Sequence, residues 1–215
     1  MKSSNSLKII IAGICSTLIA IGFGRFIYTP ILPNMQNDLD LSSTTMGIIS
    51  SYNYFGYLVG SIIPIIWKFN NFKNIIIFSS ICSVITIYLM GFTTDLKTFI
   101  ALRFFCGISS AFGFVFTISL MFNFFKDVKN KTLQLYHFCG IGLGIVIGTA
   151  TVWVISTSYF FWNHQWMFIG FIGILACIPI IFYTPKQILL INDKIDSIEN
   201  KFKIDFLSIA FGYFF

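Results

Sequence analysis

Six long apolar segments decide what this chain can fold into. They lie at about residues 9–29, 44–67, 74–92, 99–124, 133–155 and 166–183. Each has roughly 18 to 26 residues, the length of helix that crosses the hydrocarbon core of a bilayer. Only 10% of the residues are charged, against about 25% in ordinary soluble domains, so the chain lacks the polar side chains that coat a water-soluble fold. We therefore predict an all-α integral membrane protein, a six-transmembrane-helix bundle in a lipid bilayer.

The lysines are distributed unequally between the two sides of these spans. When alternate sides are counted, eleven lysines share the side of the N-terminus and only Lys97 lies opposite. Because cytoplasmic loops near span ends are enriched in Lys and Arg, we expect a cytoplasmic N-terminus in a bacterial inner membrane. The net charge of +6 does not indicate a nucleic-acid partner, since that function requires basic residues gathered on a solvated face of a polar fold.

The sequence offers no motif for catalysis, for a cofactor or for a metal. All five cysteines fall within spans and have no neighbour at metal-ligand spacing. No HExxH, GxSxG or P-loop pattern occurs, and the glycines of "GIGLGIVIG" miss the dinucleotide spacing. We predict a protein that is not an enzyme and that holds neither metal nor cofactor.

Small residues recur every four positions in several spans, which lets helix backbones approach closely in lipid. The glycines expected to serve this packing are Gly24, Gly56, Gly60, Gly107, Gly140, Gly144 and Gly148. The pattern predicts a compact bundle in residues 1–185.

Two further segments follow the predicted bundle. Residues 186–205 place apolar and charged side chains at helical spacing, which predicts an amphipathic connector on the cytoplasmic side. Residues 206–215 begin a seventh apolar run with about 15 Å of helix, roughly half of what a bilayer requires. We interpret the chain as the first part of a longer protein, whose missing C-terminal six-helix half would be its partner.

Four segments carry a resemblance to a known family. They are "GFGRFIYTPILPNMQNDLDLS", "SSYNYFGYLVGS", "LRFFCGISSAFGF" and "HFCGIGLGI", which are similar to the first, second, fourth and fifth helices of the YbfB/YjiJ-like branch of the major facilitator superfamily. The resemblance implies two six-helix bundles around a central cavity, used for alternating access by a secondary transporter.

Single positions also fit that resemblance. The first-helix signature of the branch matches Gly24-Arg25-Phe26 with Tyr28-Thr29-Pro30, and the fourth-helix motif of the superfamily matches Arg103-x-x-x-Gly107. Ile145 follows Gly144 where antiporters of the superfamily carry a proline, so the resemblance does not extend to antiport.

Arg25 and Arg103 lie within spans that contain no Asp or Glu. A charge at the centre of a membrane helix costs about 2.5 to 3.5 kcal/mol on insertion scales, so such charges usually face water or a partner. Each arginine is about four residues from the outer end of its span, roughly 6 Å below the boundary. Either the side chains snorkel to headgroups or pair with the outer acids Asp38, Asp40 or Asp95, or they face a cavity and attract an anion.

The predicted substrate-binding residues are Arg25, Tyr28, Asn53, Tyr57 and Arg103. Asn53 has an alternative role as a polar contact between two helices. His137 is a candidate proton carrier because imidazole titrates near neutral pH, or else an interface residue that bonds a neighbouring carbonyl.

Three hypotheses on function follow. The chain is the N-terminal half of a secondary transporter for a small solute, with an anionic one favoured by the two arginines, and it does not transport alone. Alternatively, it is a six-helix membrane module that serves as a partner or assembly subunit. The third hypothesis is an inactive remnant.

Overall fold

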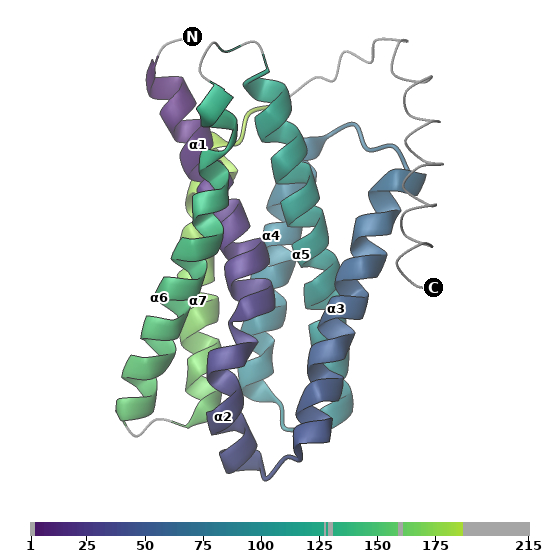
Figure 1. Cartoon of the computed structure of the whole chain (residues 1–215), viewed down its shortest axis with the longest axis vertical. Coiled ribbons are helices and arrows are strands. Elements are labelled where there is room, and N and C mark those ends of the chain that lie inside the picture. Colours follow the sequence, from purple (N-terminus) through teal and green to yellow (C-terminus); the bar gives the residue numbers. More distant parts are fainter. Residues whose placement is uncertain (1–2, 127, 129–130, 159–160, 187–215) are drawn as a thin grey trace.

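The computed structural model describes residues 3–126, 128, 131–158 and 161–186, in which helices alternate with short connections (Figure 1). The main helices are α1 (Ser3–Thr17), the π-helix η1 (Leu18–Phe26), α2 (Tyr28–Leu39), α3 (Ser43–Ile66), α4 (Phe72–Leu89), α5 (Leu96–Phe124), α6 (Cys139–Thr157) and α7 (Trp162–Tyr183). Three short 3₁₀ turns cover Met90–Phe92, Lys131–Gln134 and Tyr136–Phe138. Apart from its first residue, the predicted connector at 186–205 lies outside the described residues, as does the predicted start of a seventh helix at 206–215.

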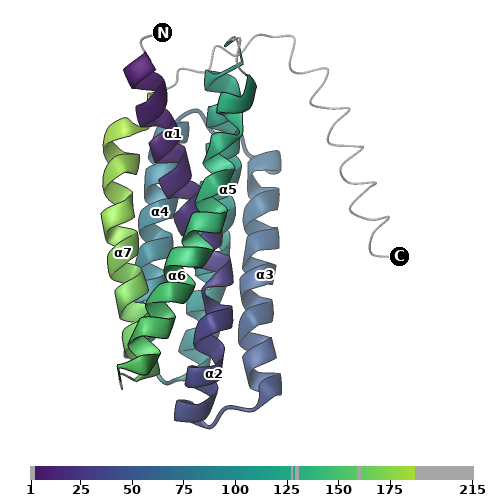
Figure 2. The same ribbon diagram turned by 60° about the vertical axis from the view of Figure 1, so that its left-hand side comes forward.

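The helices run side by side along one long axis (Figures 1 and 2). α5 packs on both α3 and α4, α4 packs on α7, and α7 packs on α1. The continuous helix formed by α1, η1 and α2 passes through the middle of this arrangement, where η1 contacts α5 and α6. α3 stands at one edge of the bundle (Figure 2) and rests mainly on α5.

Five described helical segments are long and apolar enough to cross a membrane. They are Asn5–Leu39, Phe72–Phe92, Leu96–Phe124, Thr132–Thr157 and Trp162–Tyr183. The predicted all-helical membrane bundle is thereby confirmed. The remaining expected span, 44–67, is a helix of 24 residues, α3, but polar side chains such as Ser50, Ser51 and Asn53 lie in its middle. Its passage through the membrane therefore stays a prediction.

The first helix is longer than the sequence suggested. The expected span ended near residue 29, whereas the helical segment continues to Leu39 and stops where Asp40 adopts a left-handed conformation with φ of 50°. The extension is held by tertiary contacts, because the Asn34 amide donates to the Ser156 hydroxyl at 2.7 Å and Asp38 accepts the Trp162 backbone N–H at 3.1 Å. The expected distance of Arg25 from the outer helix end was therefore wrong.

Helix backbones touch directly at several of the predicted glycine positions. A Cβ added at Gly56 would collide with the backbone carbonyl of Phe104, and one added at Gly107 would collide with that of Asn53. The same holds between the first helix and α6, where a Cβ on Gly144 would lie 2.8 Å from the Cα of Gly22. Further close approaches occur at Gly24, Gly60, Gly140 and Gly148.

We expect Gly56→Ala to lower the thermal stability of the detergent-solubilised chain, because the added methyl group must push α3 away from the backbone of α5. Overpacking of this kind costs about 1 to 3 kcal/mol. The matched control is Gly47→Ala in the same helix, since a Cβ at Gly47 would meet nothing within 4 Å. Thermal unfolding followed by circular dichroism compares the two variants. Equal melting temperatures would contradict the close α3–α5 contact.

Candidate functional site

Arg25 lies between two tyrosine rings of the neighbouring helix α3. Its guanidinium carbon is 4.5 Å from the ring centroid of Tyr57 and 5.1 Å from that of Tyr54. Such geometry is favourable because the negative face of an aromatic ring attracts a cation. Arg25 is half-buried and Tyr54 is 51% exposed. The described residues therefore do not enclose this part of the cluster.

Arg103 is enclosed instead. The side chain on α5 is only 1% exposed, and its guanidinium carbon lies 4.8 Å from the ring centroid of Tyr28. Its terminal nitrogen donates to the backbone carbonyl of Gly24 at 3.4 Å, and the Cys106 thiol donates to the same carbonyl at 3.6 Å. Arg103 thus connects α5 to the π-helical segment that carries Arg25.

The π-helix η1 places these groups. A π-helix closes i→i+5 hydrogen bonds, is rare in proteins and occurs frequently at functional sites. It spans Leu18–Phe26 and includes both Gly24 and Arg25. A side chain at Gly24 would collide with the Ser110 hydroxyl of α5, so the glycine lets the two backbones come together where Arg103 binds.

Asn53 connects α3 to α5 close to Arg103. Its amide donates to the backbone carbonyl of Arg103 at 3.0 Å, and the side chain is fully buried. The Asn53 Oδ1 atom has no partner among the described residues. These contacts correspond to the helix–helix role that the sequence left open.

The five predicted substrate-binding residues therefore fall into two groups. The open group comprises Arg25 and Tyr57, which the structure extends by Tyr54. The buried group comprises Tyr28, Asn53 and Arg103, of which Tyr28 is 2% exposed and donates its hydroxyl to the Met46 carbonyl at 3.1 Å. Sequence analysis did not select Tyr54, although its spacing of three residues from Tyr57 places both on one helix face.

Two of the three outer acids, Asp38 and Asp95, form hydrogen bonds with residues other than the two arginines. Asp38 accepts the backbone N–H of Trp162 at the start of α7. Asp95 caps α5 by accepting the Thr98 hydroxyl at 2.8 Å and its backbone N–H at 2.9 Å. These bonds from Thr98 hold the pKa of Asp95 below its usual range. Among the described residues, the interactions of Arg25 are with Tyr54 and Tyr57 and not with a carboxylate.

His137 lies at a separate interface. It is buried, its Nδ1 atom is 2.7 Å from the Gln134 carbonyl, and its own carbonyl accepts the Thr17 hydroxyl. Its Nε2 atom has no partner among the described residues. A Cβ on Gly13 would touch His137, and Gly13 precedes Arg25 by about 18 Å along the first helix. The structure therefore does not bring His137 into the arginine cluster.

Metal binding finds no support in the part of the chain that the structure describes. No group of three or more His, Cys, Asp or Glu residues there is arranged to hold an ion. The five cysteines are free thiols. The arginine cluster contains one half-buried guanidinium group, that of Arg25, beside the rings of Tyr54 and Tyr57.

A family model described as "Uncharacterised MFS-type transporter YbfB" matches residues 17–214 of the chain. The chain belongs to this family. Among curated proteins, none matches the chain closely enough to count as a relative. The YbfB-like family is one of membrane transporters, so the resemblance seen in the sequence is confirmed. The matched range includes η1, α3 and α5, and with them all residues of the arginine cluster.

The two arginines of this YbfB-like family member are its only two, which makes them internal controls for each other. We expect phenylglyoxal, an arginine-selective reagent, to modify Arg25 at least roughly tenfold faster than Arg103 in detergent micelles, because a buried side chain reacts only after local opening. Peptide mass spectrometry after timed exposure measures both rates. When the chain is unfolded in sodium dodecyl sulfate, the two arginines should be modified at equal rates. Faster reaction at Arg103 would contradict the observed burial.

Proposed function

We propose that the chain is the N-terminal half of a secondary transporter that moves a small organic anion by alternating access. The observation that carries this proposal is Arg25, a half-buried cation within a membrane helix whose contacts among the described residues are tyrosine rings. Charges inside membrane helices usually pair with one another or face a water-filled pathway. An anionic solute would supply a negatively charged partner, since the partners of Arg25 among the described residues are two tyrosines.

The tyrosines shape what Arg25 can bind. The guanidinium of Arg25 lies over the ring of Tyr57, and a carboxylate of the solute would match two parallel N–H donors of a guanidinium. Tyr54 adds an aromatic surface that is exposed beside the charge. The arrangement favours a solute with a carboxylate, phosphate or sulfonate group attached to an apolar body.

Arg103 has a different role in this proposal. Because it is 1% exposed and bonded to the Gly24 carbonyl, it holds η1 against α5 and thereby positions Arg25. One accessible cation remains for the solute, which favours a single anionic group over two.

Alternating access requires a second wall opposite the cluster. In transporters of this kind, two helix bundles rock around a site near the middle of the membrane. We propose that another six helices provide the second wall, that this chain alone does not transport, and that its N-terminus lies in the cytoplasm of a bacterium. Sequencing the DNA that follows codon 215 tests the first point. Six further apolar spans in any frame support it, whereas their absence favours the membrane module or the remnant.

In a form that carries both halves, we expect Arg25→Gln to reduce uptake of a labelled monocarboxylate into proteoliposomes by about ten- to a hundredfold. The reason is that hydrogen bonds to charged groups contribute about 1.5 to 3 kcal/mol. Arg25→Lys should retain part of the activity, because it keeps the charge and loses the planar fork. Arg103→Gln should also lower uptake, through displacement of η1.

Lys97→Gln is the matched control for these variants, since it removes an exposed cation just inside the N-terminal end of α5 and should leave uptake unchanged. Normal uptake by a protein with Arg25→Gln and Arg103→Gln together would refute the anion site.

A further inference from the structure

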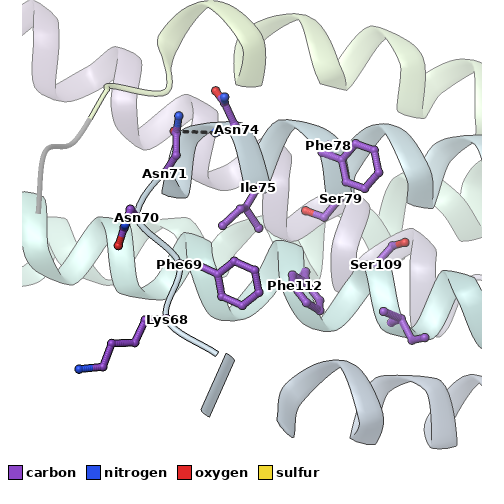
Figure 3. A pocket seen from close by; sticks show the side chains of 11 residues that line it. Lys68, Phe69, Asn70, Asn71, Asn74, Ile75, Phe78, Ser79, Ser109 and Phe112 are labelled. Carbon is purple, nitrogen blue, oxygen red and sulfur yellow. Dashed lines mark hydrogen bonds between the residues drawn. The ribbon is translucent and has the colours of Figure 1, made fainter. Parts of the chain in front are cut away.

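A groove outside the arginine cluster lies between α4, α5 and the loop that joins α3 to α4. It has a volume of about 730 Å³. Figure 3 shows Phe69 of the loop, Ile75 of α4 and Phe112 of α5 gathered around it, whereas the polar ends of Lys68 and Asn74 point away. The described residues therefore present an apolar surface to the groove.

Interlocked aromatic rings form the floor of the groove. The ring of Phe69 meets those of Phe112 and Phe116 edge to face, with centroids 5.7 and 5.4 Å apart, an arrangement that aromatic pairs favour. The hydroxyl of Ser79, which also lines the groove, donates to the Ile76 carbonyl of its own helix at 3.1 Å. The surface is therefore formed without an occupant, and it suits apolar side chains.

The groove lies at the depth of the membrane boundary. The apolar segment to which α4 belongs begins at Phe72, and Ser79 is only about 10 Å farther along the helix. Trp67, just before the loop, is 62% exposed, and tryptophan is enriched at the level of lipid headgroups. Amphipathic helices at a membrane surface bury their apolar face about 5 to 10 Å into this same boundary. The groove is therefore at the depth that such a segment occupies.

The last described helix ends beside α4, which forms one wall of the groove. α7 and α4 stand side by side (Figure 2). A Cβ on Gly170 of α7 would meet Tyr88 of α4, and farther along α7 a Cβ on Gly173 would meet Val84. The two helices are therefore antiparallel, so that the end of α7 and the start of α4 lie at the same end of the bundle.

The chain after α7 can reach the groove. About ten residues beyond Gly173, the antiparallel register brings the last residue of α7, Tyr183, level with Asn74 at the start of α4. Thr184 is still held to the bundle, since it is 4% exposed and its backbone N–H bonds the Ile180 carbonyl at 3.2 Å. From there to residue 191 an extended chain covers up to about 23 to 25 Å. A helix is about 10 to 12 Å wide, so this length suffices to pass around the start of α4 to its α5 side.

The sequence that follows carries an apolar stripe without an excess of basic charge. Ile191, Ile195, Ile198 and Phe202 recur at helical spacing, which places them on one face of an amphipathic segment. Residues 186–205 contain four lysines and four acidic residues. Amphipathic helices that bind lipid surfaces are rich in Lys and Arg, because anionic headgroups attract them. The balanced charge of this segment favours a protein surface over a lipid surface.

We propose that residues 191–202 of this same chain dock their apolar stripe into the groove between α4, α5 and the α3–α4 loop. The stripe covers Phe112 and Phe78, of which Phe78 is 70% exposed among the described residues. Docking ties the segment after the bundle to α4 and α5. The proposal is independent of the transported solute, since none of the groove residues belongs to the arginine cluster.

Photocrosslinking of the whole 215-residue chain in phosphatidylcholine nanodiscs tests the docking. The photoreactive amino acid p-benzoylphenylalanine replaces either Ile195, within the stripe, or Asn200, on the opposite face of the same helical pattern. Peptide mass spectrometry then locates the crosslinks. We expect position 195 to crosslink to residues 69–79 or 108–112 within the same chain at least about tenfold more than position 200, a factor equivalent to the burial of one large apolar side chain.

Two variants with matched controls examine the two sides of the contact. Ser109→Phe fills the groove, and Ile198→Asn interrupts the stripe while leaving the bundle unchanged. Each should lower the crosslink from position 195 by about tenfold. Ala101→Phe, at an exposed position of α5, and Ser197→Asn, outside the stripe, should leave it unaltered.

Several outcomes would overturn the proposal. Equal crosslinking from positions 195 and 200 would show that the stripe has no preferred contact. Crosslinks from position 195 to lipid alone would place the segment on the bilayer surface, and crosslinks to a second chain would show that another copy covers the groove. An unchanged crosslink in the Ile198→Asn variant would also contradict docking through the stripe.

Discussion

The close contact of α5 with two other backbones holds the centre of this bundle together. In lipid, apolar side chains give helices little reason to associate, so close packing and interhelical hydrogen bonds must do so. α5 uses both means. Gly107 lets the backbone of α3 approach, the buried amide of Asn53 bonds the carbonyl of Arg103, and the guanidinium of Arg103 bonds the carbonyl of Gly24 in η1. One helix thereby fixes the relative position of two others.

The different surroundings of the two arginines follow from this arrangement. Arg103 projects into the region where α5 meets η1, so its charge faces a carbonyl dipole and the ring of Tyr28, while its Nε atom has no hydrogen-bond partner among the described residues. Arg25 lies on η1 itself and faces α3, whose Tyr54 and Tyr57 rings lie beside it without enclosing it. α3 rests mainly on α5 at the edge of the bundle, and Tyr54 on α3 is 51% exposed. Arg103, which is buried and connects α5 to η1, and Arg25, which is only half-buried, thus lie at the same interface.

Much of the fold was predictable because apolar length and small-residue spacing are local properties of a sequence. The segments at 74–92, 99–124 and 166–183 agree with observed helices to within a few residues. The end of the first helix was not predictable, because α2 is amphipathic and depends on Asp38 and Asn34 reaching α7 and α6. The π-helical segment η1 could not be predicted either, since the residue pattern of this segment does not distinguish its hydrogen bonding from that of an α-helix.

For the site, the pattern of residues was sufficient to predict two arginines in membrane helices without acids beside them, and glycines at the helix contacts. The pattern could not assign separate roles to Arg25 and Arg103, because the predicted spans placed both at similar depths in similar apolar surroundings. Which of the two is enclosed depends on the packing of the helices. Burial of a side chain depends on the rotation of its helix against neighbours distant in sequence, and that rotation is set by the contacts of α5 with α3 and η1.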